Sequence, residues 1–303
     1  MLEVLVGTPR KGLERISAPA WSPDAQRMYF VGGTKEVYGK QFVYEESDVF
    51  AIDAARGEPQ RLTTSRDVQA VVPSPDGTAL AIARMEKPGM LPITIGLWLI
   101  DSTGGAARPL LDSKKGSLDV PGSWSPDGRV LAFTRCRFSF PDKNGLVANT
   151  CAVYTVSSDG SDLRKLADRS NTPSFSPDGR RISFVSDRDE NGKFQTGSDE
   201  ENFAGELYVM NADGSDPRRL TESEGLNEDA PSWSPDGSRI AFAREGPASF
   251  ADQVITVNPD GTCATAVIGD ASTNDVHSAS FRWPAWRPGR LKRGLAPRAC
   301  ATG

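Results

Sequence analysis

The chain of 303 residues contains one histidine, His277, which stands two residues after Asp275. An imidazole beside a carboxylate can act as a general base, so this pair suggests a hydrolytic site. A single histidine excludes any metal site that needs two imidazoles, and no motif marks a nucleophile. We therefore assign no catalytic residue. Whether the protein is an enzyme stays open at this point, and a non-catalytic protein is favoured.

A second set of residues could bind a ligand through oxygen atoms. The set is Asp67, Asp119, Asn171, Asp229, Asp275 and His277. Carboxylates suit a hard cation such as calcium, which takes six to eight oxygen ligands, and Asp67, Asp119 and Asp229 would then be its ligands. They also suit a cationic segment of a partner. Alternatively, these residues cap strand ends and solvate a water-filled channel.

Whether these residues meet depends on an internal repeat. A turn string based on Trp-Ser-Pro-Asp-Gly occurs six times, starting at residues 21, 73, 124, 175, 233 and 286, with spacings of 52, 51, 51, 58 and 53. Ser-Pro-Asp-Gly suits a type I turn, because proline presets φ at the second position and glycine accepts a positive φ at the fourth. The string is therefore a hairpin connector.

Three short strands follow each of the first five turn strings, whereas almost nothing follows the sixth. The first of them is apolar throughout, as in 130–133 and 240–243, and a further apolar strand and a short fourth strand follow it. No segment holds a 3.6-residue apolar period for ten residues. Four antiparallel strands repeated radially describe a β-propeller.

We therefore predict an all-β fold: one six-bladed β-propeller domain over residues 1–303, with four antiparallel strands per blade. The N-terminal strands would complete the last blade and close the ring, which removes exposed sheet edges. The expected blades span approximately 17–62, 68–110, 119–166, 171–220, 229–268, and 281–296 closed with 2–16.

This topology sorts the loops into two faces. The repeated turns share one face, and the long loops 32–47, 84–96, 136–152 and 187–206 share the other. The six oxygen-bearing residues stand just before the first strands, so we expect them around the channel mouth on the long-loop face. Variable loops on a rigid scaffold tend to carry binding residues.

Other polar and aromatic residues repeat with the blades and have structural explanations. The turn aspartates are expected to form turns, and the repeated tryptophans to fill space between blades. The acidic insertion 187–190 and 199–201 could contact a basic partner, or it could be a solvated loop tip.

The four cysteines leave the disulfide state open. Cys136 and Cys151 flank one long hairpin loop, so antiparallel neighbours there could reach disulfide geometry, and two reduced thiols are the alternative. The sequence does not pair Cys263 with Cys300.

Charge and hydropathy limit the classes of partner. A net charge of −5 without a basic block argues against nucleic acid. No run approaches the roughly 20 apolar residues of a membrane helix, so we expect no membrane insertion. Residues 1–6 are too short an apolar run for a secretory signal, which leaves a cytosolic protein or one whose leader has been removed.

The repeat resembles the TolB-like β-propellers, also described as WD40-like Pro-Asp repeats. The resemblance is strongest over 207–243, where Leu-Tyr-Val-Met-Asn-Ala-Asp-Gly, Arg-Arg-Leu-Thr, Trp-Ser-Pro-Asp-Gly and Ile-Ala-Phe follow one another. Such repeats occur in periplasmic scaffold proteins, in the propellers of peptidases and in polysaccharide lyases. The fold by itself does not decide among these functions.

The resemblance implies partner binding by a periplasmic or extracellular monomer. The peptidases carry a Gly-x-Ser-x-Gly motif that this chain lacks, and oligogalacturonate lyases use a histidine-rich metal site that His277 alone cannot reproduce. We expect a non-catalytic propeller that binds a protein or peptide at the long-loop face and channel mouth. The alternatives are a calcium-type lyase or hydrolase acting on an extracellular carbohydrate or ester, and the propeller domain of a larger sensor or enzyme.

Overall fold

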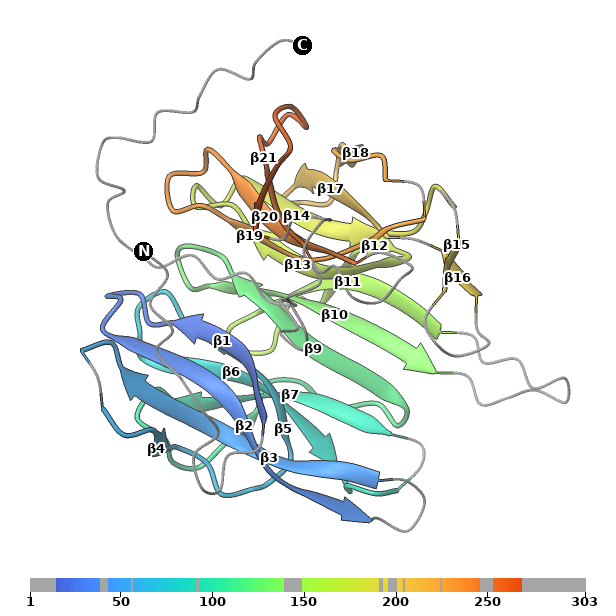
Figure 1. Cartoon of the computed structure of the whole chain (residues 1–303). Coiled ribbons are helices and arrows are strands. Elements are labelled where there is room, and N and C mark those ends of the chain that lie inside the picture. Colours follow the sequence, from blue (N-terminus) through green and yellow to red (C-terminus); the bar gives the residue numbers. More distant parts are fainter. Residues whose placement is uncertain are drawn as a thin grey trace, which may run out of the picture.

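The structure is a computed structural model that contains strands and turns and, among the residues it describes, no helix (Figure 1). It describes residues 15–38, 43–55, 57–90, 93–138, 149–190, 193–195, 201–203, 205–223, 225–245 and 253–268.

Five antiparallel groups of four strands, here called blades 1 to 5, follow one another in chain order. Blades 2 and 3 are joined into one eight-stranded sheet by a parallel contact between their strands β7 and β9. Blade 1 contains β1 (Arg15–Trp21), β2 (Arg27–Tyr38), β3 (Val43–Asp53) and β4 (Gln60–Arg61). Blade 2 contains β5 (Val68–Pro73), β6 (Ala79–Glu86), β7 (Thr94–Asp101) and β8 (Arg108–Pro109). Blade 3 contains β9 (Ser117–Trp124), β10 (Val130–Phe138), β11 (Asn149–Ser157) and β12 (Arg164–Asp168).

The last two described blades have the same order of pairing. Blade 4 contains β13 (Ser170–Phe175), β14 (Arg181–Ser186), β17 (Glu206–Asn211) and β18 (Arg218–Arg219). Between its second and third strands lies a separate hairpin of β15 (Lys193–Gln195) and β16 (Glu201–Phe203). Blade 5 contains β19 (Asn227–Trp233), β20 (Ile240–Glu245), β21 (Gln253–Val257) and β22 (Thr265–Ile268).

The repeated turn is built in the same way in every described blade. In blade 3 the Ser125 hydroxyl donates to Asp127 Oδ1 at 2.6 Å and accepts the Val130 N–H at 3.0 Å. The Gly128 N–H donates to the Ser125 carbonyl. The equivalent serine–aspartate hydrogen bonds in the other blades join Ser22 to Asp24, Ser74 to Asp76, Ser176 to Asp178 and Ser234 to Asp236. The turn string therefore forms the hairpin between the first two strands, as predicted.

Consecutive turns also pack against each other. A Cβ placed on Gly179, whose φ is +70°, would lie 3.2 Å from Cδ of Pro126 in the preceding turn. Gly77, Gly128 and Gly237 stand in the same relation to Pro23, Pro75 and Pro177, at 3.7 Å. At Gly179 both the φ and the close neighbour favour glycine, whereas at the other three positions the φ alone does. Blade 1 has Ala25 at the equivalent position, with φ +57°.

The core follows the second strands. Phe30, Phe133, Phe184 and Phe242 occupy equivalent positions there and are fully buried. Tryptophans at the ends of two first strands bridge neighbouring blades: Trp124 Nε1 donates to the Val72 carbonyl at 3.4 Å, and Trp233 Nε1 to the Ser174 carbonyl at 3.1 Å. These tryptophans lie between blades, as the repeat predicted.

The all-β architecture of successive antiparallel sheets is as predicted, and the expected sixth blade, with residues 281–296 and 2–14, lies outside the described residues. One boundary differs. Arg15 and Ile16 were expected in the closing blade but belong to β1, where they pair with Gly33 and Gly32. The first strand of blade 1 therefore begins two residues earlier than the apolar pattern indicated.

Replacing Gly179 with alanine should lower the free energy of unfolding by about 1–2 kcal/mol, because an alanine in the left-handed region is strained. Gly57 has no positive φ, and its nearest neighbour to an added Cβ is 3.9 Å away. Gly57→Ala should leave stability unchanged or raise it. Urea denaturation of both variants tests this; equal effects would contradict the role given to the turn glycine.

Candidate binding site at the central channel

The first strands of all five described blades line one cavity of about 320 Å³. β5 contacts β1 and β9, and β13 contacts β9 and β19, so these strands follow one another around it. Each contributes a proline to the wall: Pro19, Pro73, Pro121, Pro173 and Pro231. Proline has no N–H, so the wall lacks hydrogen-bond donors at five places.

The cavity wall has apolar surface and hydrogen-bond acceptors but, among the described residues, no lysine, arginine or histidine. Two of its hydroxyl groups satisfy the backbone of blade 4. Thr134 Oγ1 accepts the Thr172 N–H at 2.9 Å, and Ser123 Oγ accepts the Phe175 N–H at 2.6 Å. The wall is therefore an apolar surface with hydroxyl and carbonyl oxygens.

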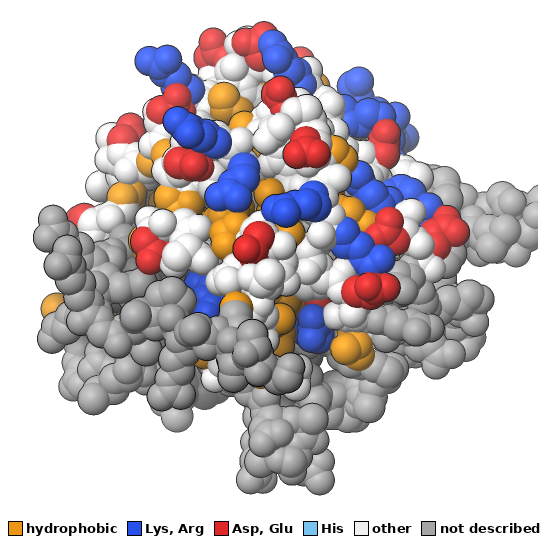
Figure 2. Space-filling model, turned by 90° about the horizontal axis from the view of Figure 1, so that it is seen from above, with side chains coloured by type: hydrophobic (Ala, Val, Ile, Leu, Met, Phe, Trp, Pro, Cys, Tyr) orange, Lys and Arg blue, Asp and Glu red, His pale blue; other side chains and the backbone are white. Residues whose placement is uncertain are grey.

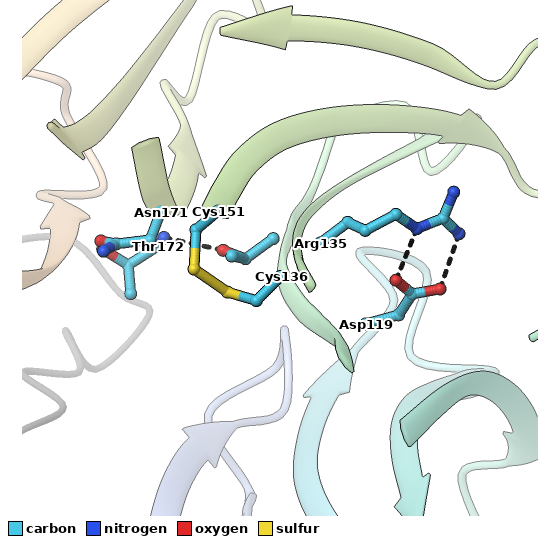
Figure 3. Close-up of a disulfide and its surroundings, with 7 residues drawn as sticks. Asp119, Arg135, Cys136, Cys151, Asn171 and Thr172 are labelled. Atoms are coloured by element: carbon cyan, nitrogen blue, oxygen red, sulfur yellow. Dashed lines mark hydrogen bonds and ion pairs between the residues drawn. A yellow bond between two sulfur atoms is a disulfide. The ribbon is translucent and has the colours of Figure 1, made fainter. Parts of the chain in front are cut away.

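Two of the predicted site residues, Asp67 and Asp119, are bound inside their blades by arginines. The Asp119 side chain is 0% exposed and accepts two hydrogen bonds of 2.7 Å from Nε and Nη2 of Arg135 (Figure 3). Arg84 binds Asp67 in the same way, with Nη2 to Oδ2 at 2.8 Å. Neither aspartate is part of the cavity wall.

The Arg135 guanidinium also stacks on aromatic rings, 5.4 Å from the centroid of Phe133 and 5.3 Å from that of Tyr154. Burial raises the pKa of Asp119, although the Arg135 hydrogen bonds and charge oppose this. The hydrogen bond to Asp119 in turn raises the pKa of Arg135. The pair has the contacts of a structural ion pair.

Asn171 and Asp229 lie closer to the cavity. Both are half-buried, and each immediately precedes a wall residue, Thr172 or Ala230. In blade 5 the carboxylate that binds the arginine of the second strand is Glu228 and not Asp229. Arg244 Nη2 donates to Glu228 Oε1 at 2.6 Å. Asp275 and His277 lie outside the described residues.

The strand registers show which carboxylate meets the arginine. Glu228 stands opposite Arg244 in blade 5, and Asp119 stands opposite Arg135 in blade 3. Both carboxylates lie five residues before the tryptophan that ends the first strand, Trp233 or Trp124. The predicted Asp229 is the next residue along the chain and stands opposite Ala243.

These contacts bear on the expected calcium ligands. Within the ranges that the structure describes, no three His, Cys, Asp or Glu side chains are grouped so that they could hold a metal ion. The carboxylate oxygens of Asp67 and Asp119 bind the guanidinium groups of Arg84 and Arg135. A cation would need the same oxygens, and the positive charge of the arginines would repel it. The described residues do not fit a calcium site.

Cys136 and Cys151 form a disulfide. They stand directly opposite each other on β10 and β11, with 4.0 Å between their Cα atoms. The bond ties the end of β10 to the beginning of β11 (Figure 3). Cys263 is disulfide-bonded as well, and Cys300 lies outside the described residues.

Charges on the visible surface are mixed. Figure 2 shows Lys and Arg side chains interspersed with Asp and Glu, with no field of one sign among the described residues of that face. Within the described part of the chain, no helix is long and apolar enough to cross a membrane.

Similar proteins come from several bacteria. A solved structure assigned as TolB from Agrobacterium tumefaciens superposes with a TM-score of 0.65 and 23% identity, covering 94% of this chain and 89% of that one. TolB from Acinetobacter baumannii gives a TM-score of 0.57 with 18% identity, covering 82% of this chain and 53% of that one. The chain has a TolB-like β-propeller fold. The resemblance stated from the repeat is confirmed.

Sequence relatives agree with this fold. A TolB homolog of Chlorobium chlorochromatii is 31% identical over 201 residues, covering 61% of this chain and 40% of the relative. An uncharacterized protein of Agrobacterium fabrum is 26% identical over 240 residues, covering 76% of this chain and 66% of the relative. An uncharacterized peptidase of Bacillus subtilis is 32% identical over 136 residues, covering 41% of this chain and 19% of the relative. The chain thus spans less than two thirds of the length of each.

Enzymes share the fold. An oligogalacturonate lyase in complex with manganese gives a TM-score of 0.54 at 15% identity, covering 84% of this chain and 65% of that one. Puromycin hydrolase gives 0.57 at 16% identity, covering 86% of this chain and 40% of that one. No protein-family model matches the chain. The function must therefore be argued from the site.

Sequence reasoning missed the arginines and the prolines. Arg84, Arg135 and Arg244 each end the apolar second strand of a repeat, at the same distance from the turn glycine. A cation that repeats at the end of a buried strand signals a buried partner. A proline likewise recurs just before each turn string or within it, which could have identified the channel wall.

Removing Arg135 should cost far more stability than removing an exposed cation. Arg135→Met leaves Asp119 buried without a partner, which typically costs about 3–5 kcal/mol. Lys165→Met breaks the exposed pair with Asp168 and should hardly change the melting temperature. A double variant, Asp119→Leu with Arg135→Met, should recover most of the loss. A small effect of Arg135→Met would mean that Asp119 is free to bind a ligand.

The turn aspartates should make the folded state less stable at low pH. A hydrogen bond from the serine hydroxyl, followed by one from a backbone N–H, lowers the pKa of Asp127 and its four equivalents. A carboxylate with a lowered folded pKa stabilises the fold above its unfolded pKa of about 3.9, and this is lost as the pH falls.

Melting temperature should therefore fall steeply below about pH 4. Asp127→Asn combined with Asp178→Asn should make that decline shallower, because two of the titrating turns are removed. Asp112→Asn, at an exposed position outside the repeated turns, is the control. If the melting temperatures of the double variant and the native protein fall equally at low pH, the turn aspartates do not cause the acid dependence.

Proposed function

We propose that this chain is a non-catalytic TolB-like propeller that binds a protein or peptide at the central channel and the long-loop face around its mouth. The observation that carries the proposal is the cavity of about 320 Å³ whose wall comes from the first strand of every described blade. A cavity built by the rigid centre of a fold is a preformed site, which lowers the entropic cost of binding.

The wall chemistry supports a particular kind of segment. Prolines and small apolar side chains supply most of the surface, and Ser123, Ser174 and Thr172 supply oxygens. A segment with small apolar side chains and hydrogen-bond donors is complementary to such a wall. The half-buried Asn171 and Asp229 at the edge of the wall add acceptors for a donor or a cation.

The long-loop side gives the mouth a variable rim. Its loops differ in length between blades, and in blade 3 the Cys136–Cys151 disulfide fixes the base of one of them. Disulfides persist in oxidising compartments. The bond supports a periplasmic or extracellular location, which the resemblance also implies.

A metal-assisted lyase or hydrolase remains the competing function because enzymes share the fold. That function would require carboxylates facing the channel. Asp67 and Asp119 face arginines instead, so a binding protein agrees better with the described residues.

Filling the channel should abolish binding. Val72 lines the cavity, and Val72→Phe would place an aromatic ring there. Val267 is 58% exposed on β22, so Val267→Phe is the same change outside the cavity. Peptides selected on the native protein from a display library should bind Val72→Phe at least about tenfold more weakly, a loss of about 1.4 kcal/mol. Val267→Phe should bind them normally.

Fluorescence anisotropy with the selected peptides, together with the melting temperature of each variant, checks this prediction. Equal affinities of Val72→Phe and the native protein would place the peptide site elsewhere. If Val72→Phe does not fold, Ala20→Phe replaces it in the same measurement, because Ala20 lines the same cavity from β1.

A further inference from the structure

Two buried glutamates meet where blade 4 contacts blade 5. Glu206 begins β17, Glu228 lies in β19, and each is 1% exposed. Thr221 lies between them: its Oγ1 is 2.8 Å from Glu206 Oε2 and 2.5 Å from Glu228 Oε2. The Leu207 N–H points at the same place, 2.9 Å from Thr221 Oγ1 and 2.8 Å from Glu228 Oε2.

The hydrogens available at this place are too few if both glutamates are ionised. A threonine hydroxyl has one hydrogen to donate, and an ionised carboxylate has none. Thr221 can donate to only one of its two carboxylate neighbours. The other short oxygen–oxygen contact needs a hydrogen on a carboxyl group, because buried oxygens with facing lone pairs repel each other. The hydroxyl can accept that hydrogen as well as the Leu207 N–H.

Two arginines contact the cluster. Arg244 Nη2 donates to Glu228 Oε1 at 2.6 Å, and Arg219 Nη2 lies 3.3 Å from Glu206 Oε1. Arg219 is shared, since its Nη1 lies 3.2 Å from Asp189 Oδ2. Both arginines reach the Oε1 atoms, so neither donates a hydrogen to the Oε2 atoms beside Thr221.

Other described neighbours direct their hydrogens elsewhere. Tyr208 donates its hydroxyl hydrogen to Asp189, and burial together with this hydrogen bond raises the pKa of Tyr208, so it stays neutral. Arg188 stacks on the Tyr208 ring and donates to the hydroxyls of Ser170 and Ser186. The Ser223 N–H donates to Glu206 Oε1 and the Ser223 hydroxyl to Glu228 Oε1, the oxygens that Thr221 does not contact.

We propose that Glu206 and Glu228 hold one shared proton at neutral pH, bridged by the Thr221 hydroxyl, and that this proton fastens blade 4 to blade 5. The acid hydrogen of one carboxyl group is donated to Thr221 Oγ1, and the threonine hydrogen is donated to the other carboxylate. Burial raises the pKa of Glu228, and the neighbouring Glu206 raises it further, against the opposing effects of Thr221 and Arg244.

A proton held by the folded state makes stability depend on pH in a defined direction. A carboxyl group with a raised folded pKa contributes stability that is present below its unfolded pKa, about 4.3, and lost as the pH rises through the folded pKa. The contact between blades 4 and 5 should therefore weaken as the pH rises above neutrality.

Infrared spectroscopy of protein labelled with carbon-13 in glutamate carboxyl groups tests the proposal. The native protein at pH 7 should show the carbonyl stretch of a protonated glutamic acid, shifted by the label. Glu228→Gln should lose this band and should show a smaller decline in melting temperature between pH 6 and pH 9. Glu222→Gln is the matched control, because Glu222 is exposed between Thr221 and Ser223.

The band of the native protein is decisive even if Glu228→Gln does not fold, and Glu206→Gln provides a second variant. Retention of the band in Glu222→Gln and its loss in either buried variant would support the shared proton. Absence of the band from the native protein at pH 7, or its survival in both buried variants, would overturn it.

Discussion

The first strand of each described blade pairs along one edge with the second strand, and at the other edge only β9 has a strand partner, the parallel β7. The way in which this other edge is satisfied shapes both the fold and the cavity wall. In blade 4 that edge receives the hydroxyls of Thr134 and Ser123, and Trp233 of the next blade donates to its Ser174 carbonyl. Prolines remove further donors from the channel wall. Unpaired backbone groups are costly when buried, so this arrangement protects the inner edges and leaves a wall of apolar surface and acceptors.

Charges buried within the blades serve stability instead of recognition. Asp67, Asp119 and Glu228 are each matched by an arginine from the second strand of the same blade. Arg84 and Arg135 also stack on aromatic rings. A carboxylate so bound offers little to a ligand. Under the proposed function, recognition would fall to the cavity wall and to its edge, where Asn171 and Asp229 are half-buried.

Much of this fold could be predicted because each blade repeats its turn chemistry. The Ser–Asp–Gly pattern identified the hairpins, and the apolar strands after it identified the core, including Phe133 and Phe184. The site was less predictable. Asp119 and Glu228 stand opposite the arginines of their second strands, and only the strand register shows that Glu228, and not the neighbouring Asp229, does so in blade 5. The disulfide of Cys136 and Cys151 was open, because only the strand register shows that the two cysteines are opposite each other.

The central claim is that the channel wall, and not the outer surface of the blades, receives a partner segment. Amide hydrogen exchange, followed by mass spectrometry with and without a bound peptide, tests it most directly. We predict added protection in β1, β5, β9, β13 and β19 and in the adjoining long-loop rim, with the outer strands β4, β8, β12, β18 and β22 unchanged. Protection confined to the outer strands, with the first strands unchanged, would contradict the account.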